Sequence, residues 1–381
     1  MTTCGGVVRD VKWWEYLISR EFIKRGHDVT VLTSTSVMKV FPSAKREEVI
    51  DGINVKRFHP LSPAALKWML RNDFDVIDTD FPGYIAPLSS WAAIRKRMKD
   101  IPMVQAVHGL YHDPYLVEDV EDPFSKPIKY DNMQREFSVT KAANWFCHLP
   151  IFTADRVFAL NKFEKQELIK FGVLEEKIDV VPNGIDLKQY NKKTKDFKKK
   201  MDIGGEMILF VGQPIRRKGP EYLLASMPYV LKEFPDATLV FIGYKRNESL
   251  ESIYKELNLG DSVRFLGFVS EDDKVAAFRS CDVFCMPSNY EGLGIVYLES
   301  MACGVPIVTT NTPGIADLVE PRKNGLLVPP KNPKKIAQAI IEILSDRNLG
   351  KRMRRNNTKK VKNFSVGNVA KKTLAIYEEI L

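Results

Sequence analysis

The chain has 381 residues, more than one ordinary hydrophobic core accommodates. Of these residues 44% are hydrophobic and 28% charged, a composition that excludes a disordered protein. The net charge of +9 favours anionic partners such as phosphates without selecting among them. No apolar run approaches the roughly 20 residues of a spanning helix, no signal-peptide segment opens the chain, and the five cysteines are scattered, so we expect a cytoplasmic protein without disulfides.

The first half of the chain alternates helical and strand-like segments. A helix is expected over residues 8–25, where apolar side chains recur at helical spacing and Gly26 provides a stop signal. Strands are expected at residues 27–33, 53–58, 74–77 and 103–107, with helices near 64–70 and 85–98. This alternation predicts a parallel, doubly wound sheet.

A Gly-Gly pair, Gly5-Gly6, stands directly before the first expected helix. A turn of this kind normally follows a first strand, and no apolar segment precedes it here. We therefore expect the first N-terminal strand of the sheet to be missing from the chain as written. Either the true start lies upstream, which we favour, or the domain has lost this strand.

Residues 111–150 are the least regular part of the chain. The aromatic-rich segment 137–152 suits either contact with a membrane or acceptor or a helix that faces the core, and both interpretations stay open. A lysine cluster at residues 192–200 reads as a linker, and a second α/β series follows it. We predict one domain of residues 1–187, with the C-terminal helix 364–381 packed back on it, and a second of residues 188–363.

A basic turn, GQPIRRKGP, joins an expected strand at residues 207–211 to a helix. Gly212 permits a tight turn, and Arg216, Arg217 and Lys218 bring positive charge to the carboxyl end of the strand. Lysine as a point charge and arginine as a bidentate donor both suit a diphosphate. Basic turns are usually only solvated, but the position at a strand end favours a phosphate site.

The stretch Pro287–Val308, PSNYEGLGIVYLESMACGVPIV, reads as a glycine-punctuated turn and a helix between two strands. Such a turn directs unpaired N–H groups and the helix dipole toward an anion. Glu291 and Glu299 are about 12 Å apart if the residues between them are helical. Glycoside hydrolases need roughly 5–9.5 Å between their carboxyl groups, so this pair better suits the two ends of a nucleotide sugar. A solvent-facing Glu299 is the alternative.

These stretches resemble the retaining glycosyltransferases of the GT4 family, which have a Glu-x7-Glu signature and the GT-B fold. EGLGIVYLESMACGVPIV resembles that signature, and the similarity extends to GGVV, RGHDVTVLT, KIDVVPNGID, VGQPIRRKG and FLGFVSEDDKVAAFRSCDVFCMPS. It covers nearly the whole chain and is weakest over residues 111–150. The resemblance implies an α/β protein of two Rossmann-like, doubly wound domains facing a cleft, with the donor bound by the C-terminal one.

The resemblance also implies a role for each matching residue. Lys218 would bind the donor diphosphate, Glu299 the ribose hydroxyls and Glu291 the transferred sugar. Further implied contacts are the backbone amides of Gly292, Leu293, Gly294 and Ile295 with the sugar, Gly6 with the phosphates, the backbone of Val269 with the base, and His108 beside the reacting sugar. Gln213 stands where the family usually has arginine, and Arg216 or Arg217 would supply that charge. The implied reaction retains anomeric configuration and needs no metal and no cofactor beyond a UDP-, GDP- or ADP-sugar.

Asp78-Thr79-Asp80 offers a rival interpretation, because a DxD pair binds Mn²⁺ and a nucleotide sugar in the GT-A fold. It lies in the other half of the chain from Lys218 and Glu299, so we expect Asp80 to face an acceptor hydroxyl instead. The acceptor stays open among a lipid-linked sugar, a polysaccharide and a small metabolite.

Two further functions also stay open. A GT-B-fold sugar-nucleotide epimerase would convert the donor without an acceptor. A non-catalytic module would bind a nucleotide or an acidic lipid in peripheral contact with the inner membrane face. Nucleic acid is not an expected partner, because only the net charge favours it.

Overall fold

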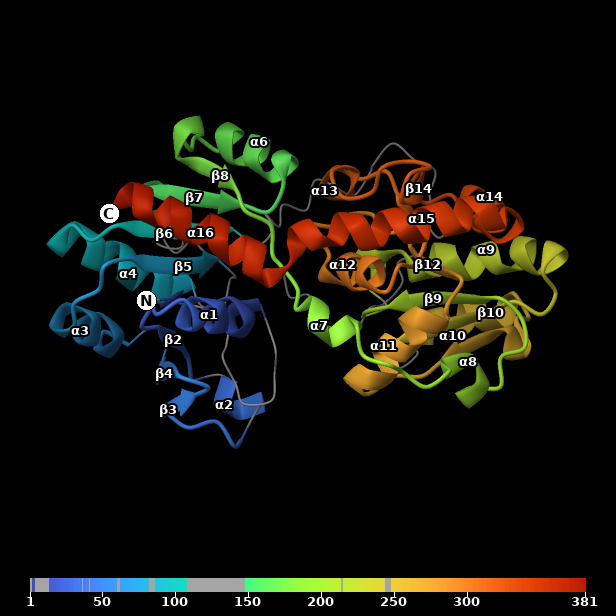
Figure 1. The fold of residues 1–381 in the computed structure, drawn as a ribbon, viewed down its shortest axis with the longest axis horizontal. Coiled ribbons are helices and arrows are strands. Elements are labelled where there is room, and N and C mark those ends of the chain that lie inside the picture. Colours follow the sequence, from blue (N-terminus) through green and yellow to red (C-terminus); the bar gives the residue numbers. More distant parts are fainter. Residues whose placement is uncertain are drawn as a thin grey trace. The chain divides into compact units, whose positions relative to one another are not determined.

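The computed structural model of the protein describes residues 2–3, 14–35, 37–40, 42–59, 62–81, 86–107, 148–213, 215–243 and 248–381. These residues divide into two compact units. The first holds the described residues up to 107, residues 148–186 and the C-terminal segment 364–381, and the second holds described residues from 187 to 363. Each unit contains a largely parallel sheet with helices, as the sequence pattern predicts (Figure 1).

The first sheet has eight strands among the described residues, in the order β3-β4-β2-β1-β5-β6-β7-β8. Neighbours pair in parallel except β3 and β4, which are antiparallel. The strands are β1 (Thr2–Thr3), β2 (Thr30–Ser34), β3 (Glu47–Ile50), β4 (Ile53–Phe58), β5 (Ile77–Phe81), β6 (Met103–Val107), β7 (Arg156–Ala159) and β8 (Ile178–Val180). The helices of this unit include α1 (Trp14–Lys24), α2 (Val37–Val40), α3 (Ala64–Arg71), α4 (Ala86–Lys99), α6 (Lys162–Lys170), the 3-10 turn η2 (Glu175–Lys177) and α16 (Val366–Ile380).

The expectation that the first strand is missing was wrong. Thr2 and Thr3 form β1, which lies in the middle of the sheet and pairs in parallel with β2 on one side and β5 on the other. Because β2 and β5 offer backbone hydrogen-bond partners on both sides, a strand of only two β-branched residues can form between them. A strand of two residues has no visible apolar period, which is why the sequence pattern concealed it.

The C-terminal helix α16 packs on the first unit. The ring centroid of Tyr377 lies 5.9 Å from that of Phe22 and 6.5 Å from that of Phe158, on which it stacks. The Tyr377 hydroxyl also donates a hydrogen bond to the Asp78 carboxylate on β5. The end of the chain therefore completes the core of the unit in which the chain begins.

The second sheet has six strands among the described residues, all parallel, in the order β11-β10-β9-β12-β13-β14. The strands are β9 (Met207–Val211), β10 (Thr238–Ile242), β11 (Val263–Phe265), β12 (Val283–Met286), β13 (Ile307–Thr310) and β14 (Gly325–Val328). The helices are α7 (Leu187–Tyr190), α8 (Phe197–Lys200), η3 (Arg216–Lys218), α9 (Pro220–Glu233), α10 (Glu248–Glu256), η4 (Gly260–Ser262), α11 (Glu271–Ser280), α12 (Ile295–Ala302), α13 (Pro313–Ala316), α14 (Pro333–Ser345), α15 (Arg347–Lys360) and η5 (Val361–Phe364), whose last residue falls in the first unit.

The central strands of the second sheet are buried along their whole length. Every residue of β9, β10, β12 and β13 is buried, as expected for parallel strands covered on both faces. Because all six strands run in the same direction, their carboxyl ends meet at one edge of the sheet. Ligands of open parallel sheets bind at this edge.

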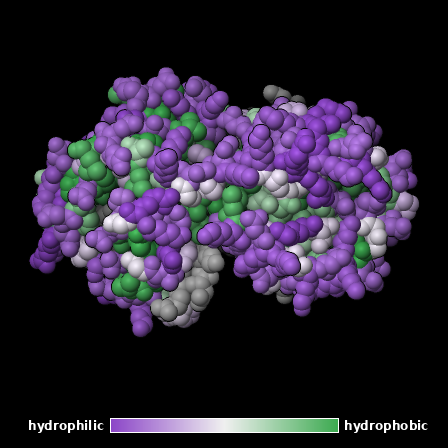
Figure 2. All heavy atoms as spheres, in the orientation of Figure 1, coloured by the Kyte–Doolittle hydropathy of each residue, from purple (hydrophilic) through white to green (hydrophobic). Residues whose placement is uncertain are grey.

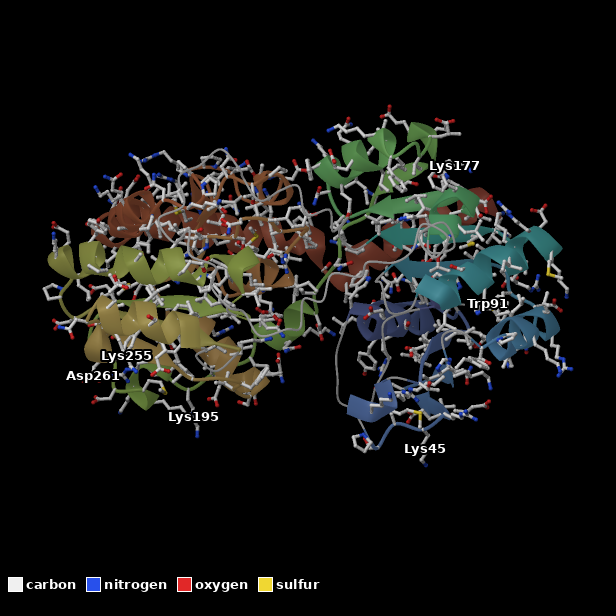
Figure 3. All side chains as sticks on the ribbon, turned by 180° about the vertical axis from the view of Figure 1, so that it is seen from behind. Lys45, Trp91, Lys177, Lys195, Lys255 and Asp261 are labelled. Atoms are coloured by element: carbon white, nitrogen blue, oxygen red, sulfur yellow. The ribbon has the colours of Figure 1, made fainter. Side chains whose placement is uncertain are left out.

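The lysine cluster at residues 192–200 is part of the second unit rather than a linker between the units. Its helix α8 buries Phe197 in that unit. Lys198 pairs with Asp282 at 2.6 Å and Lys200 with Asp273 at 2.6 Å. Lys195 is exposed and points away from the unit (Figure 3). The packing of one aromatic side chain and two ion pairs thus hold this segment on the second unit, although its charge alone would predict a solvated segment.

The outer surface is mostly polar. Figure 2 shows hydrophilic residues over most of the face in view. None of the helices formed by the described residues combines the length and the apolar content that crossing a membrane requires.

Candidate functional site

Glycine turns lie side by side at the carboxyl edge of the second sheet. Gly212 follows β9 with a φ of +143°, and Gly243 follows β10 with a φ of +113°, conformations that favour glycine. The Gly243 N–H donates to the Gly267 carbonyl at 2.8 Å. A Cβ on Gly243 would lie 3.1 Å from the Gly212 nitrogen. The turns after three neighbouring strands therefore approach one another with no side chain between them.

The side chain of Lys218 lies over the first of these turns. A Cβ on Gly212 would come within 2.7 Å of the Lys218 ammonium nitrogen, so the absence of a side chain there gives the ammonium its place. Among the described residues, no carboxylate or carbonyl oxygen lies within hydrogen-bond or ion-pair distance of this ammonium. Burial lowers its pKa, and the nearby Arg217 adds to that effect, while the charges of Glu291 and Glu299 oppose it. Within the part of the site that the structure describes, this ammonium is thus a desolvated cation without a counterion.

The basic turn is fixed against the segment that follows β12. Gly219 has a φ of +61°, and a Cβ on it would lie 2.3 Å from the Pro287 carbonyl oxygen. The Asn289 N–H donates to the Arg217 carbonyl at 2.7 Å. These contacts place Arg217 and Lys218 near Glu291, in the turn after β12.

The carboxylate of Glu291 is buried and half satisfied. Arg217 Nη1 lies 3.2 Å from Glu291 Oε1 and 3.3 Å from the carbonyl oxygen of Tyr290. Glu291 Oε2 is buried and has no hydrogen-bond partner among the described residues. Gly294, with a φ of +65°, would place a Cβ 2.9 Å from Glu291 Cγ. The turn thus holds one oxygen with a cation and leaves the other for a donor from a ligand.

Glu299 lies in the second turn of α12 and is 8% exposed. Its Oε1 accepts hydrogen bonds from Lys274 Nζ at 2.9 Å and from the Tyr190 hydroxyl at 2.8 Å. The alternative of a solvent-facing Glu299 is therefore wrong, because α11 and α7 both place donors on its carboxylate. Oε2 accepts no hydrogen bond from any described side chain.

The structure brings most of the predicted donor-site residues to one edge. Arg217, Lys218 and Glu291 contact or influence one another electrostatically, as described above. Leu293 is buried while Ile295, the first residue of α12, is 39% exposed. The remaining described residues of the predicted set are Gly292 and Gly294 beside Glu291, Glu299 on α12, and Val269 in the turn after β11.

Three residues of the predicted site lie partly or wholly outside the residues that the structure describes. Gly6 and His108 are outside the described residues, and only the backbone of Arg216, in η3, is described. Arg217 is committed to Glu291, and Gln213 is exposed. Lys218 is therefore the cation of this turn whose described surroundings leave it free for an anion.

Sequence reasoning missed Lys274 and Tyr190. Both hold Glu299, yet they lie 25 and 109 residues away from it in the sequence. Neither residue stands in a motif with Glu299, so no spacing signal could have found them. The exposed Phe268, beside Val269, was also not singled out.

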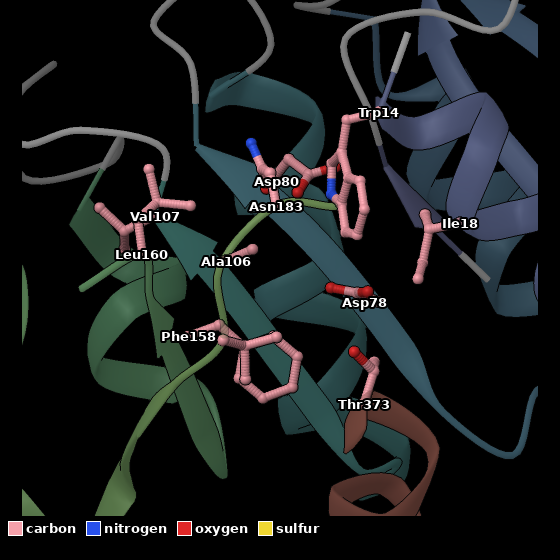
Figure 4. A pocket seen from close by; sticks show the side chains of 11 residues that line it. Trp14, Ile18, Asp78, Asp80, Ala106, Val107, Phe158, Leu160, Asn183 and Thr373 are labelled. Carbon is pink, nitrogen blue, oxygen red and sulfur yellow. The ribbon is translucent and has the colours of Figure 1, made fainter. Parts of the chain in front are cut away.

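A small cavity of about 30 Å³ lies at the carboxyl edge of the first sheet. Figure 4 shows Asp78, Asp80 and Asn183 around it, with Trp14 and Phe158 on opposite sides. Asp80 is buried, and one oxygen of Asp78 accepts the Tyr377 hydroxyl. Within the described ranges no three His, Cys, Asp or Glu side chains gather as a metal site would require.

Both halves of the chain are similar to known protein families. A family model described as "Glycosyltransferase Family 4" matches residues 16–189, and one described as "Glycosyl transferases group 1" matches residues 191–360. An uncharacterised glycosyltransferase of Methanocaldococcus jannaschii is 29% identical over 95% of this chain and 92% of its own. Spore coat protein SA of Bacillus subtilis is 26% identical over 94% and 91%.

Among solved structures, HepE of Anabaena in complex with UDP matches with a TM-score of 0.77. The match has 18% sequence identity and covers 99% of this chain and 98% of that one. The fold is therefore the GT-B fold, with two Rossmann-like domains.

Proposed function

We propose that this chain, which belongs to the group 1 glycosyltransferases, transfers a sugar from a nucleotide-sugar donor to an acceptor with retention of anomeric configuration and without a metal ion. The proposal assigns the donor to the second unit. It assigns the acceptor, a lipid-linked sugar, a polysaccharide or a small metabolite, to the first.

The unpaired ammonium of Lys218 carries this proposal. A desolvated cation over a glycine turn costs free energy unless an anion joins it. A donor diphosphate would supply that anion, with its oxygens near the turns after β9 and β10. The similarity to HepE, which was solved with UDP, supports a nucleoside diphosphate as the ligand class.

The two glutamates would each recognise a different sugar ring of the donor. Glu299 would accept hydrogen bonds from the ribose, and the buried free oxygen of Glu291 would accept one from the transferred sugar. The backbone of residues 292–295 would contact the same sugar, and the backbone of Val269 the base. Gly6, His108 and the Arg216 side chain keep their predicted roles toward the phosphates and the reacting sugar.

The same residues would support departure of the diphosphate. Negative charge grows on the leaving oxygen as the glycosidic bond breaks, and a fixed cation at that position stabilises it more in the transition state than in the ground state. Lys218 would carry out this task, and the N-terminus of α12, beginning at Ile295, would add its dipole.

The glutamate variants test these roles. Screening UDP-, GDP- and ADP-sugars by thermal shift identifies the donor, because a bound ligand stabilises the fold by mass action. We expect Glu299→Ala to weaken binding of that donor about tenfold and Glu291→Gln to lower turnover about 100-fold with little change in donor affinity. Transfer at the parent rate by both variants would contradict the assignment.

Two controls separate the rival activities. NMR of the donor incubated without acceptor detects an epimerase, which would convert the sugar by itself. Activity abolished by a chelator and restored by Mn²⁺ would support the metal-dependent alternative at Asp78 and Asp80.

A further inference from the structure

Tyr190 enters the donor site from a part of the chain with no counterpart in the site motifs. It is the last residue of α7, the short helix with which the second unit begins, and it is 4% exposed. Its carbonyl oxygen accepts two N–H groups of Arg279, from Nε at 3.1 Å and from Nη2 at 2.5 Å. The backbone of Tyr190 is thereby fixed to α11, and its hydroxyl, 2.8 Å from Glu299 Oε1, has little freedom to move.

Lys274 approaches the same oxygen from α11. Its ammonium lies 2.9 Å from Glu299 Oε1 and 2.9 Å from an oxygen of Glu271. The helix that carries it is capped by Ser270, whose hydroxyl accepts the Asp273 N–H at 3.1 Å. Ser270 directly follows Val269, so the helix that carries Lys274 begins next to the residue that we assign to the base.

Both donors keep their protons over the working pH range. Burial raises the pKa of the Tyr190 phenol, and the charge of Glu299 raises it further. Burial would lower the pKa of Lys274, but the carboxylates of Glu299 and Glu271 outweigh it and the pKa is raised. The phenol and the ammonium are therefore permanent donors to Glu299.

The two contacts fall on one oxygen. Oε1 receives both donors, whereas no described side chain donates to Oε2. A carboxylate with one oxygen held at two points cannot rotate about its terminal bond without breaking both hydrogen bonds. The orientation of Oε2 is thus fixed before any ligand binds, which lowers the entropy lost on binding.

We propose that Tyr190 and Lys274 are positioning residues, which hold Oε1 of Glu299 so that Oε2 alone meets the vicinal hydroxyl pair of the donor ribose. The inference rests on the proposed function, because it takes Glu299 as the ribose contact. Two hydroxyls can share the two lone pairs of one oxygen. The arrangement therefore predicts selection of ribose against deoxyribose.

Tyr190→Phe tests this role because it removes one hydroxyl and keeps the ring. We would measure by calorimetry the dissociation constants of UDP, GDP and ADP, and then those of the 2′-deoxy and 3′-deoxy forms of the tightest binder. We expect the variant to bind the ribonucleotide about tenfold more weakly and the deoxy forms less than twofold more weakly than the parent. If the phenol has only a structural role, its loss should weaken binding of the ribonucleotide, the 2′-deoxy form and the 3′-deoxy form equally. That result would overturn the proposal, and so would an unchanged affinity for the ribonucleotide.

Matched variants separate the outcomes. Tyr254→Phe, which removes an exposed hydroxyl bound to the Gly260 carbonyl at 2.7 Å, should change no affinity. Lys274→Met removes the second donor and should also reduce the ribose preference about tenfold, so it tests the proposal independently if Tyr190→Phe folds poorly. If Glu299→Ala leaves ribonucleotide binding unchanged, the proposed function of Glu299 fails. If Glu299→Ala weakens binding but Tyr190→Phe and Lys274→Met do not, only the positioning role fails.

Discussion

In the first unit Asp78 and Asp80 of β5 line one small cavity, whereas in the second unit Arg217 and Lys218 follow β9 at the carboxyl edge of the sheet. Both sheets are largely parallel and both are flanked by helices. The glutamates of the second edge each contact a cation, which leaves Lys218 as a charge without a partner among the described residues.

Under the proposed function, this difference would let one architecture serve two substrates. A cavity lined by two carboxylates repels a diphosphate and suits hydroxyl groups, while a desolvated ammonium over a glycine turn attracts a diphosphate. The sheets supply the same scaffold in both units, and the turn residues decide which ligand can bind. Three experiments can break or sharpen the comparison.

The largest effect is expected from Lys218→Met, which removes the charge that distinguishes the second edge. Affinity for the nucleoside diphosphate that the protein binds should fall at least about 100-fold in calorimetry, because a hydrogen-bonded charge pair is lost. The unliganded protein should become more stable, by about 1 kcal/mol in denaturant unfolding, because an unpaired desolvated charge is gone. Lys255→Met, an exposed lysine paired with Glu251, is the matched control and should change neither quantity. A Lys218→Met protein that binds as tightly as the parent would remove the basis of the comparison.

An intermediate effect is expected from pH. Burial lowers the pKa of Lys218 below its ordinary value of 10.5, so the free protein loses this proton earlier in an alkaline titration than the unfolded chain does. Nucleotide affinity should therefore fall as the pH rises toward 10.5, and binding should take up a proton in calorimetry in buffers of different ionisation enthalpy.

The stability of the unliganded protein carries the opposite sign. Between the lowered pKa and 10.5 the unfolded chain binds more protons at this position, so the contribution of Lys218 to stability rises with pH. Lys218→Arg keeps its charge throughout this range and should bind nucleotide without the pH slope. A slope that persists in that variant would assign the titration to another group.

The smallest effect is expected from Tyr377→Phe in the first unit. The variant loses the hydrogen bond to Asp78 and should lower the free energy of unfolding by about 1 kcal/mol, or the melting temperature by about 2–4 °C. Nucleotide affinity should stay within about twofold of the parent value. A larger loss of affinity would mean that the two edges do not act as separate sites.

Local signals carried most of the fold and much of the donor site. The strands of the second sheet are continuous apolar runs because both faces are buried, so β9 and β12 could be recognised one by one. Lys218, Glu291 and Glu299 could be singled out because each lies beside a glycine turn or a strand end in the sequence itself. Contacts between distant segments left no such signal, as Tyr190 beside Glu299 and Tyr377 beside Asp78 illustrate.

The two-residue strand β1 has a mechanical consequence for the first sheet. Among the described residues, it joins the block β3-β4-β2 to the block β5-β6-β7-β8 through Thr2 and Thr3. A ladder of this length contributes few backbone hydrogen bonds, so the sheet has a seam at its centre rather than at an edge. Under a pulling force or in native-state hydrogen exchange, separation should begin at this seam, with each block keeping its own protected amides.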